Sequence, residues 1–246
     1  MTEYLTSPQG RRLAYNRTPG TGPGVVFLGG FKSDMEGSKA RFLEDWARAQ
    51  GRAFLRFDYS GHGVSDGEFE AGCIGDWRDD ARAVFLALTS GPQVLVGSSM
   101  GGWIALLLAR EMPERIAGLV TIAAAPDFTV ITWDDELTEA QRAEVRDTGR
   151  TTMDSGYADN PYVFTARLFE DGANQRVMTT PLHLPFRTRL LQGTADVDVL
   201  PQIAVNLLNH ATGPDIRLTL VRDADHRFST PDMLALIAAS VEEVLR

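Results

Sequence analysis

Residues 93–110 read QVLVGSSMGGWIALLLAR, and this stretch decides the fold. A β-rich run (QVLVGS) leads abruptly into an apolar helical run (WIALLLAR). The GSSMG at 97–101 matches the Gly-x-Ser-x-Gly pattern of a nucleophile on a strand-to-helix turn. The chain folds back on itself at such a turn, so small residues must flank the serine, as Gly97 and Gly101 do. The pattern therefore predicts that Ser99 is a nucleophile.

Outside this stretch, short apolar runs alternate with helical runs over most of the chain. Residues 4–7 and 12–16 favour an opening hairpin, and strand patterns then recur at 24–30, 53–58, 93–98, 116–124, 189–192 and 216–221. Helical patterns occupy 34–51, 76–88, 103–110 and 231–245. This alternation predicts an α/β domain with a mostly parallel eight-stranded sheet that is flanked by helices.

The alternation stops over residues 126–186, which carry acidic residues, a helical run at 137–146 and aromatic residues without strand spacing. An insertion of roughly 60 residues is too long for a plain loop. We predict a small helical cap over the end of the sheet, inserted within a single domain of residues 1–246. Its aromatic residues, which are expected in part to line an acyl pocket, are Phe128, Trp133, Tyr157, Tyr162, Phe164 and Phe169.

A serine nucleophile in this topology is followed in the chain by an acid and then by a histidine, each after a later strand. Among the four histidines, only His226 follows the last predicted strand. Asp196 follows the strand that ends at Gly193, and Asp198 could be presented by the same loop. We favour Asp196 because it lies three residues after that glycine. The predicted triad is therefore Ser99, Asp196 and His226.

Acyl transfer also requires N–H donors aimed at the developing oxyanion. Met100, directly after the nucleophile, is the first predicted donor. Phe31 is the second, because Gly29 and Gly30 allow the backbone to turn in close to the reacting group. Their side chains are expected to line the acyl pocket or the core.

The sequence carries no pattern of a metal or nucleotide site. No set of histidine and glutamate residues has metal-site spacing, and the lone Cys73 has no paired histidine at a suitable place. The glycines at 29–30 and 61–63 do not form a dinucleotide-binding fingerprint, and no Walker-type Gly-Lys-Ser/Thr is present. We therefore expect no metal and no cofactor.

The net charge and the hydrophobic patterning of the chain restrict the classes of partner that it can bind. The chain has 33 acidic residues against 24 Lys and Arg, and its formal net charge of -9 disfavours nucleic acid. Its longest apolar run is far shorter than the ~20 residues of a membrane span. It begins with neither a secretory nor a transit pattern, so we expect a cytoplasmic protein. We expect a small-molecule or acylated-protein substrate, and the sequence leaves the oligomeric state open.

Five segments in order resemble the α/β-hydrolase superfamily: GVVFLGGF, FDYSGHGVSDG, LVGSSMGGW, LLQGTADVDV and DADHRF. Within this superfamily, residues 56–61, 96–103 and 225–227 look most similar to a mitochondrial branch found in animals. Members of that branch act as acyl-protein thioesterase and acyl-glucuronide esterase. That resemblance implies deacylation of esters or thioesters, and it carries the same triad. The match departs at the missing presequence and in residues 126–186, which align with no motif of the family.

These observations predict a serine hydrolase that cleaves carboxylic esters or acyl thioesters through an acyl-enzyme intermediate. The same triad would also serve a serine peptidase or a hydrolase of carbon–carbon bonds. A non-catalytic ligand receptor could keep the same fold and pocket.

Overall fold

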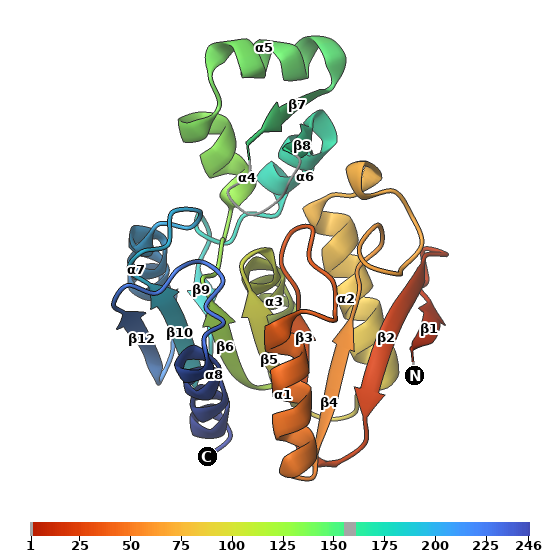
Figure 1. Cartoon of the computed structure of the whole chain (residues 1–246), viewed down its shortest axis with the longest axis vertical. Helices are drawn as coiled ribbons and strands as arrows, with labels where there is room; N and C mark the ends of the chain where they lie inside the picture. Colours follow the sequence, from red (N-terminus) through yellow and green to blue (C-terminus); the bar gives the residue numbers. More distant parts are fainter. Residues whose placement is uncertain (1, 155–160) are drawn as a thin grey trace.

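The computed structural model describes residues 2–154 and 161–246, and an eight-stranded sheet forms its centre (Figure 1). The strand order is β1-β2-β4-β3-β5-β6-β10-β12, with β1, β2 and β4 paired antiparallel and the rest parallel. Its strands are β1 (Glu3–Thr6), β2 (Arg12–Thr18), β3 (Thr21–Leu28), β4 (Arg52–Phe57), β5 (Gln93–Ser98), β6 (Ile116–Ile122), β10 (Thr188–Gly193) and β12 (Ile216–Val221). The predicted α/β-hydrolase architecture is confirmed.

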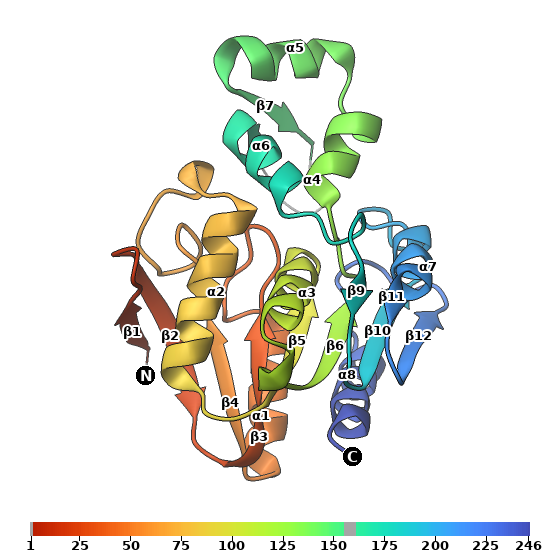
Figure 2. The same ribbon diagram turned by 180° about the vertical axis from the view of Figure 1, so that it is seen from behind.

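Helices cover both faces of the sheet. Helices α1 (Ser38–Ala49) and α8 (Pro231–Val244) lie together on one face, and α2 (Ile74–Leu88) and α3 (Met100–Glu111) lie on the other (Figures 1 and 2). Helix α7 (Pro201–His210) packs on β10 and β12. Short turns η1 (Phe69–Ala71) and η2 (Pro113–Arg115) complete this part of the chain, residues 2–125 and 187–246, which we call the body. None of the helices in the described ranges has the length and apolar character that a membrane-spanning helix needs.

The region around the GSSMG turn is the most deeply buried part of the body. All six residues of β5 are buried, and so are the first ten residues of α3. A central parallel strand has helices over both faces, so it reads as a continuous apolar run rather than an alternating one. Helix α3 is apolar on all sides because the sheet, α2 and residues 126–186 surround it. The turn between β5 and α3 is thereby held on rigid elements.

Residues 126–186, which we call the insert, leave the sheet after β6 and return to it at β10. The insert stands above the carboxyl ends of the strands (Figures 1 and 2). It contains α4 (Phe128–Ile131), the π-helical turn η3 (Thr132–Glu136), α5 (Glu139–Thr148), β7 (Arg150–Met153), β8 (Tyr162–Thr165), α6 (Ala166–Asn174) and β9 (Leu182–His183). Strand β9 pairs with β11 (Ala211–Thr212) of the body.

The sequence predicted a helical cap, but the insert contains strands as well as helices. Strands β7 and β8 pair antiparallel, and each has only four residues, too few to show a strand period in the sequence. Helix α5 begins at a capping box between Thr138 and Gln141 and ends at Gly149, whose φ is 82°. Tyr157, one of the predicted pocket aromatics, lies outside the described residues.

Candidate active site

Ser99 occupies a strained position at the turn between β5 and α3. Its φ of 54° and ψ of −121° place it in a region that residues with a side chain rarely adopt. Its N–H donates to the carbonyl of Ile122 at 2.9 Å, and its side chain is half-buried. A Cβ at Gly97 would overlap the carbonyl of Gly101, so the turn depends on these glycines.

His226 and Asp196 come to Ser99 from the ends of two other strands. His226 lies in the loop after β12, and Asp196 lies in the loop after β10. His226 Nε2 is 3.2 Å from Ser99 Oγ, and His226 Nδ1 is 2.9 Å from Asp196 Oδ2. Carboxyl ends of parallel strands meet at one edge of a sheet, which is why residues far apart in sequence converge here. The three predicted side chains form one hydrogen-bonded chain.

Asp196 is held as a buried carboxylate. Its Oδ1 accepts backbone N–H groups of Asp198 and Val199 at 3.0 and 2.8 Å, and its Oδ2 accepts the Gln192 amide at 2.9 Å. Burial by itself raises the pKa of Asp196. The hydrogen bond and charge of His226, with the other donors, outweigh it and lower the pKa below the ordinary aspartate value. Asp196 therefore stays ionised at neutral pH.

Asp198, the alternative acid, is exposed and contributes its backbone N–H to Asp196. Potential ligand atoms of Asp196, Asp198 and His226 lie within 4.8 Å of one another, the one such group of three in the described part of the chain. A metal there would compete with the hydrogen bond between His226 and Asp196. The absence of a metal stays a prediction.

Two supporting residues escaped the sequence analysis. Gln192 is fully buried, and its amide bridges Asp196 and the carbonyl of Val199. Lys39 Nζ donates to the carbonyl of Arg227 at 2.6 Å and so ties the loop of His226 to α1; burial lowers the pKa of Lys39 to about 8. The only signal for the first was a glutamine directly before the glycine that ends its strand, and nothing in the sequence marked the second.

The two expected oxyanion donors flank Ser99. Met100 is the first residue of α3, so its N–H has no acceptor within the helix. The loop after β3 runs against the nucleophile, because a Cβ at Gly30 would lie 3.3 Å from Ser99 Cβ. Among the described residues, the N–H of Phe31 has no hydrogen-bond acceptor. The Met100 side chain is in the core, whereas the Phe31 ring lines a pocket.

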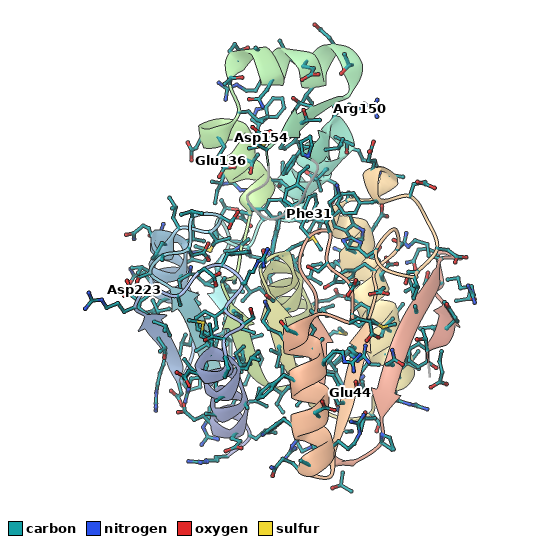
Figure 3. All side chains as sticks on the ribbon, in the orientation of Figure 1. Phe31, Glu44, Glu136, Arg150, Asp154 and Asp223 are labelled. Atoms are coloured by element: carbon teal, nitrogen blue, oxygen red, sulfur yellow. The ribbon has the colours of Figure 1, made fainter. Side chains whose placement is uncertain are left out.

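That pocket has a volume of about 400 Å³ and lies between the insert and the loop after β10. Its apolar wall comes from the insert, from the segment after β10 and from the ends of β3 and β6. It consists of Phe31, Ala125, Phe128, Ile131, Met153, Tyr162, Phe164, Val197, Val199, Leu200 and Ile203. Its charged lining is acidic, from Glu136, Asp154 and Asp198; Figure 3 shows Phe31 below Glu136 and Asp154. A larger cavity of about 610 Å³ lies within the insert, and two of the predicted pocket aromatics, Trp133 and Phe169, line it instead of the first pocket; no residue of the predicted triad or oxyanion pair does.

The other candidate reactive groups lie elsewhere. His62 is buried among aromatic rings, and desolvation lowers its pKa to about 4. His183 is exposed on β9, and His210 bonds to the carbonyls of Val177 and Thr180. Burial raises the pKa of Cys73 to about 12, so its thiol is protonated at neutral pH.

A serine at a strained strand-to-helix turn, followed on later strand ends by an aspartate and a histidine, is the arrangement of α/β hydrolases. The family model described as alpha/beta hydrolase fold matches residues 24–167, and the chain belongs to this family.

Individual proteins to which the chain is similar indicate a narrower group within this family. The chain is 32% identical to "Palmitoyl-protein thioesterase ABHD10, mitochondrial" of Rattus norvegicus over 98% of this chain and 82% of the relative. A protein of Agrobacterium vitis S4, provisionally described as a hydrolase, has a TM-score of 0.96 and 39% identity, covering 100% of this chain and 99% of its own. The alpha/beta hydrolase domain-containing protein 10 from mouse has a TM-score of 0.92 and 30% identity, covering 100% and 98%. These names support an enzyme of the ester or thioester hydrolase type, as the sequence predicted.

The predicted cytoplasmic location is wrong. Relatives from rat, cow, mouse and human that match 98% of the chain are named as mitochondrial proteins. The prediction rested on leader patterns that the sequence does not show, and a missing pattern does not specify a compartment.

Proposed function

We propose that this chain is a serine hydrolase that cleaves carboxylic esters or acyl thioesters through an acyl-enzyme on Ser99. The observation that carries the proposal is the hydrogen-bond chain from Ser99 through His226 to Asp196, at 3.2 and 2.9 Å. Its members follow the chain order that this fold uses for acyl transfer. Relatives named as palmitoyl-protein thioesterases support the same chemistry.

In the first half-reaction, Ser99 Oγ attacks the carbonyl carbon of the substrate while its proton passes to Nε2 of His226. The carbonyl oxygen becomes an oxyanion that accepts hydrogen bonds from the N–H groups of Phe31 and Met100. Asp196 keeps Nδ1 of His226 protonated and stabilises the imidazolium. His226 then gives its proton to the leaving alcohol or thiol, and the acyl group stays on Ser99.

In the second half-reaction, water attacks the acyl-enzyme. His226 removes a proton from that water, and the same two N–H groups bind the second oxyanion. As the tetrahedral intermediate collapses, the bond from its carbon to Ser99 Oγ breaks, His226 returns its proton to Oγ, and the carboxylic acid is released.

The proposed substrate is a small molecule or an acylated protein with a compact or medium-length apolar acyl group. The pocket of about 400 Å³, with its aromatic and aliphatic wall, supports such a group. The insert acts as a cap over it within one domain of residues 1–246. The acidic lining from Glu136, Asp154 and Asp198 favours an uncharged or cationic leaving group over an anionic one.

A probe and a substrate panel test the proposal together. A fluorophosphonate should label the protein, and p-nitrophenyl esters and acyl thioesters from acetyl to palmitoyl should be turned over many times. Among thioesters of one acyl chain, the uncharged N-acetylcysteamine thioester should be preferred to the anionic coenzyme A thioester. Labelling with at most one turnover would favour a receptor, and a lack of labelling would reject the serine mechanism.

A further inference from the structure

The Phe31 ring contacts aromatic rings of both the body and the insert. On the side of the body, its centroid lies 4.8 Å from that of Phe69 in η1 and 5.9 Å from that of Trp77 in α2. On the side of the insert, the rings of Phe128, Tyr162 and Phe164 lie at 5.7, 5.7 and 5.6 Å. The residue proposed as an oxyanion donor thus has its side chain packed between the body and the insert.

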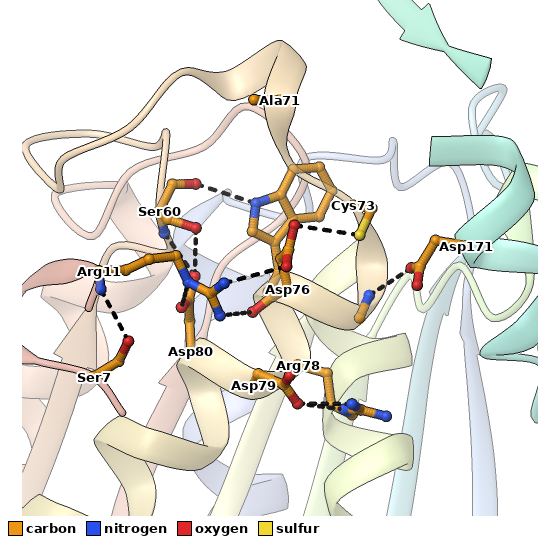
Figure 4. A network of polar contacts seen from close by, with 12 residues as sticks. Ser7, Arg11, Ser60, Ala71, Cys73, Asp76, Arg78, Asp79, Asp80 and Asp171 are labelled. Atoms are coloured by element: carbon orange, nitrogen blue, oxygen red, sulfur yellow. Dashed lines mark hydrogen bonds and ion pairs between the residues drawn. The ribbon is translucent and has the colours of Figure 1, made fainter. Parts of the chain in front are cut away.

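The rings of the body that contact Phe31 are held in place by a hydrogen-bond network. Trp77 Nε1 donates to the carbonyl of Ser60 at 3.1 Å, and the N–H and hydroxyl of Ser60 donate to Asp80. Arg11 bridges Asp80 and Asp76 in the same network (Figure 4). Buried, fully bonded polar groups hold the rings above them in fixed places.

The insert side is anchored at its base but reaches Phe31 only through side chains. Asp171 of α6 accepts the N–H of Gly75 at 2.6 Å (Figure 4), and Trp103 Nε1 donates to the carbonyl of Gln175. The Phe164 ring, on β8, stacks on Phe31 at an interplanar angle of 23°. These contacts fix where the insert places its rings.

The loop that carries the donor is anchored on either side of Phe31, where the Tyr59 hydroxyl donates to the carbonyl of Gly29 at 3.3 Å and the N–H of Met35 donates to Asp58 at 2.6 Å. Lys32 has a φ of 56°, a left-handed conformation that costs free energy for a residue with a side chain. Its ammonium lies 5.5 Å from the Phe69 ring centroid and 5.4 Å from that of Tyr162, so it too spans the body and the insert. One backbone hydrogen bond, from Ser33 to Gly30, closes the turn.

We infer that the ring of Phe31 is a positioning group: contact with the insert fixes the N–H of Phe31 where the oxyanion forms. The inference rests on the proposed function and adds that the insert takes part in the chemistry as well as in binding the acyl group. A displaced oxyanion donor lowers transition-state stabilisation more than substrate binding, so loss of this contact should reduce kcat rather than raise KM.

The test uses p-nitrophenyl acetate, whose acyl group is too short to fill the pocket. Phe164→Leu removes a ring that stacks on Phe31, and Phe169→Leu is the matched control. Phe169 is as buried in the insert as Phe164 and stacks on it, and within the described residues its ring does not contact that of Phe31. Fluorophosphonate titration gives the concentration of active sites, so a loss of folded protein does not enter kcat.

We expect Phe164→Leu to lower kcat per active site roughly tenfold with KM nearly unchanged, and Phe169→Leu to lower it less than threefold. Affinity for a boronic acid, which mimics the tetrahedral intermediate, should fall with kcat. Phe31→Leu, which removes the ring from the donor residue itself, should lower kcat as Phe164→Leu does. If Phe164→Leu folds poorly, Phe128→Leu removes another of the contacts.

Equal kcat values for Phe164→Leu and Phe169→Leu, or a loss confined to KM, would overturn the inference. Failure of the proposed function has a different signature, because wild-type protein would then show neither labelling nor turnover.

Discussion

The body and the insert meet at one pocket but are built in different ways. In the body, Asp196 is 2% exposed, and four donors bond it at 2.8 to 3.0 Å. The insert reaches the pocket through aromatic rings, and its outer contacts include an exposed ion pair between Arg150 and Glu70. Hydrogen bonds between buried groups fix direction more tightly than ring packing and exposed ion pairs do. We expect the reaction to depend mainly on the body, with the insert contributing the position of Phe31, and the choice of substrate to depend mainly on the insert.

The sharpest test of this division is Ser99→Ala. Removal of a triad nucleophile typically lowers kcat by about 10⁶, and the side chain contributes little packing because it is half-buried at a turn. Ester turnover and fluorophosphonate labelling should disappear, while circular dichroism and the urea midpoint stay close to wild type. A folded variant that retained more than about a tenth of the activity would contradict the assignment.

The next effect separates the two aspartates of one loop. Asp196→Asn should lower kcat by about 10⁴, because an amide cannot stabilise the imidazolium and favours the wrong tautomer of His226. Asp198→Asn, two residues away and exposed, is the matched control and should change kcat little. Measured kcat values with the large loss at Asp198 instead would reverse the assignment of the acid.

Sequence reasoning performed best where a pattern was local and buried on all sides. The run at 93–98 predicted β5 with the bounds that the structure has, because a strand covered on both faces leaves no doubtful ends. Helix α3 begins at Met100, three residues before the predicted start. The prediction started too late because Gly101 and Gly102 have low helix propensity and do not look helical in the sequence. The order of the residues that follow later strands was enough to predict that Asp196 and His226 lie beside Ser99, and the structure places them in hydrogen-bond contact.

The insert and the support of the site lay beyond that reasoning. Strands β7 and β8 owe their existence to each other, since four residues carry no reliable period. Gln192 acts through contacts with the loop that follows its strand. The rings around Phe31 come from residues between 69 and 164, and only the tertiary fold brings them together.

The insert itself is tested by the dependence of rate on acyl length. Because each added methylene in an apolar pocket gains roughly 1–3 kcal/mol until the pocket is full, kcat/KM should rise with chain length and then stop. A double variant, Phe128→Ala with Tyr162→Ala, should flatten that rise by about tenfold relative to the acetyl ester. The control, Trp133→Ala with Phe169→Ala, alters the other cavity of the insert and should keep the profile. A profile indifferent to chain length would place the acyl pocket elsewhere.

The smallest expected effect concerns stability rather than activity, and it lies on the body side of the ring cluster. His62 is 3% exposed and contacts Tyr59, Phe69 and Trp77, and burial lowers its pKa from 6.5 to about 4. The unfolded chain therefore binds a proton between these values that the folded protein excludes. Stability from this residue is present above about pH 6.5 and is lost as the pH falls toward 4.

From pH 7 to pH 5 this residue should cost roughly 2 kcal/mol of the free energy of unfolding, as the difference between the two pKa values requires. His62→Gln removes the titrating group, so urea unfolding at the two pH values should show a smaller acid destabilisation than in wild type. His183→Gln, at an exposed histidine, should leave the wild-type pH dependence in place. The absolute stability of His62→Gln will also fall through lost packing, and only the difference between the two pH values reports the proton. An acid destabilisation identical in wild type and His62→Gln would mean that His62 takes up its proton as readily in the folded body as in the unfolded chain, and that the body beneath the rings is open to water.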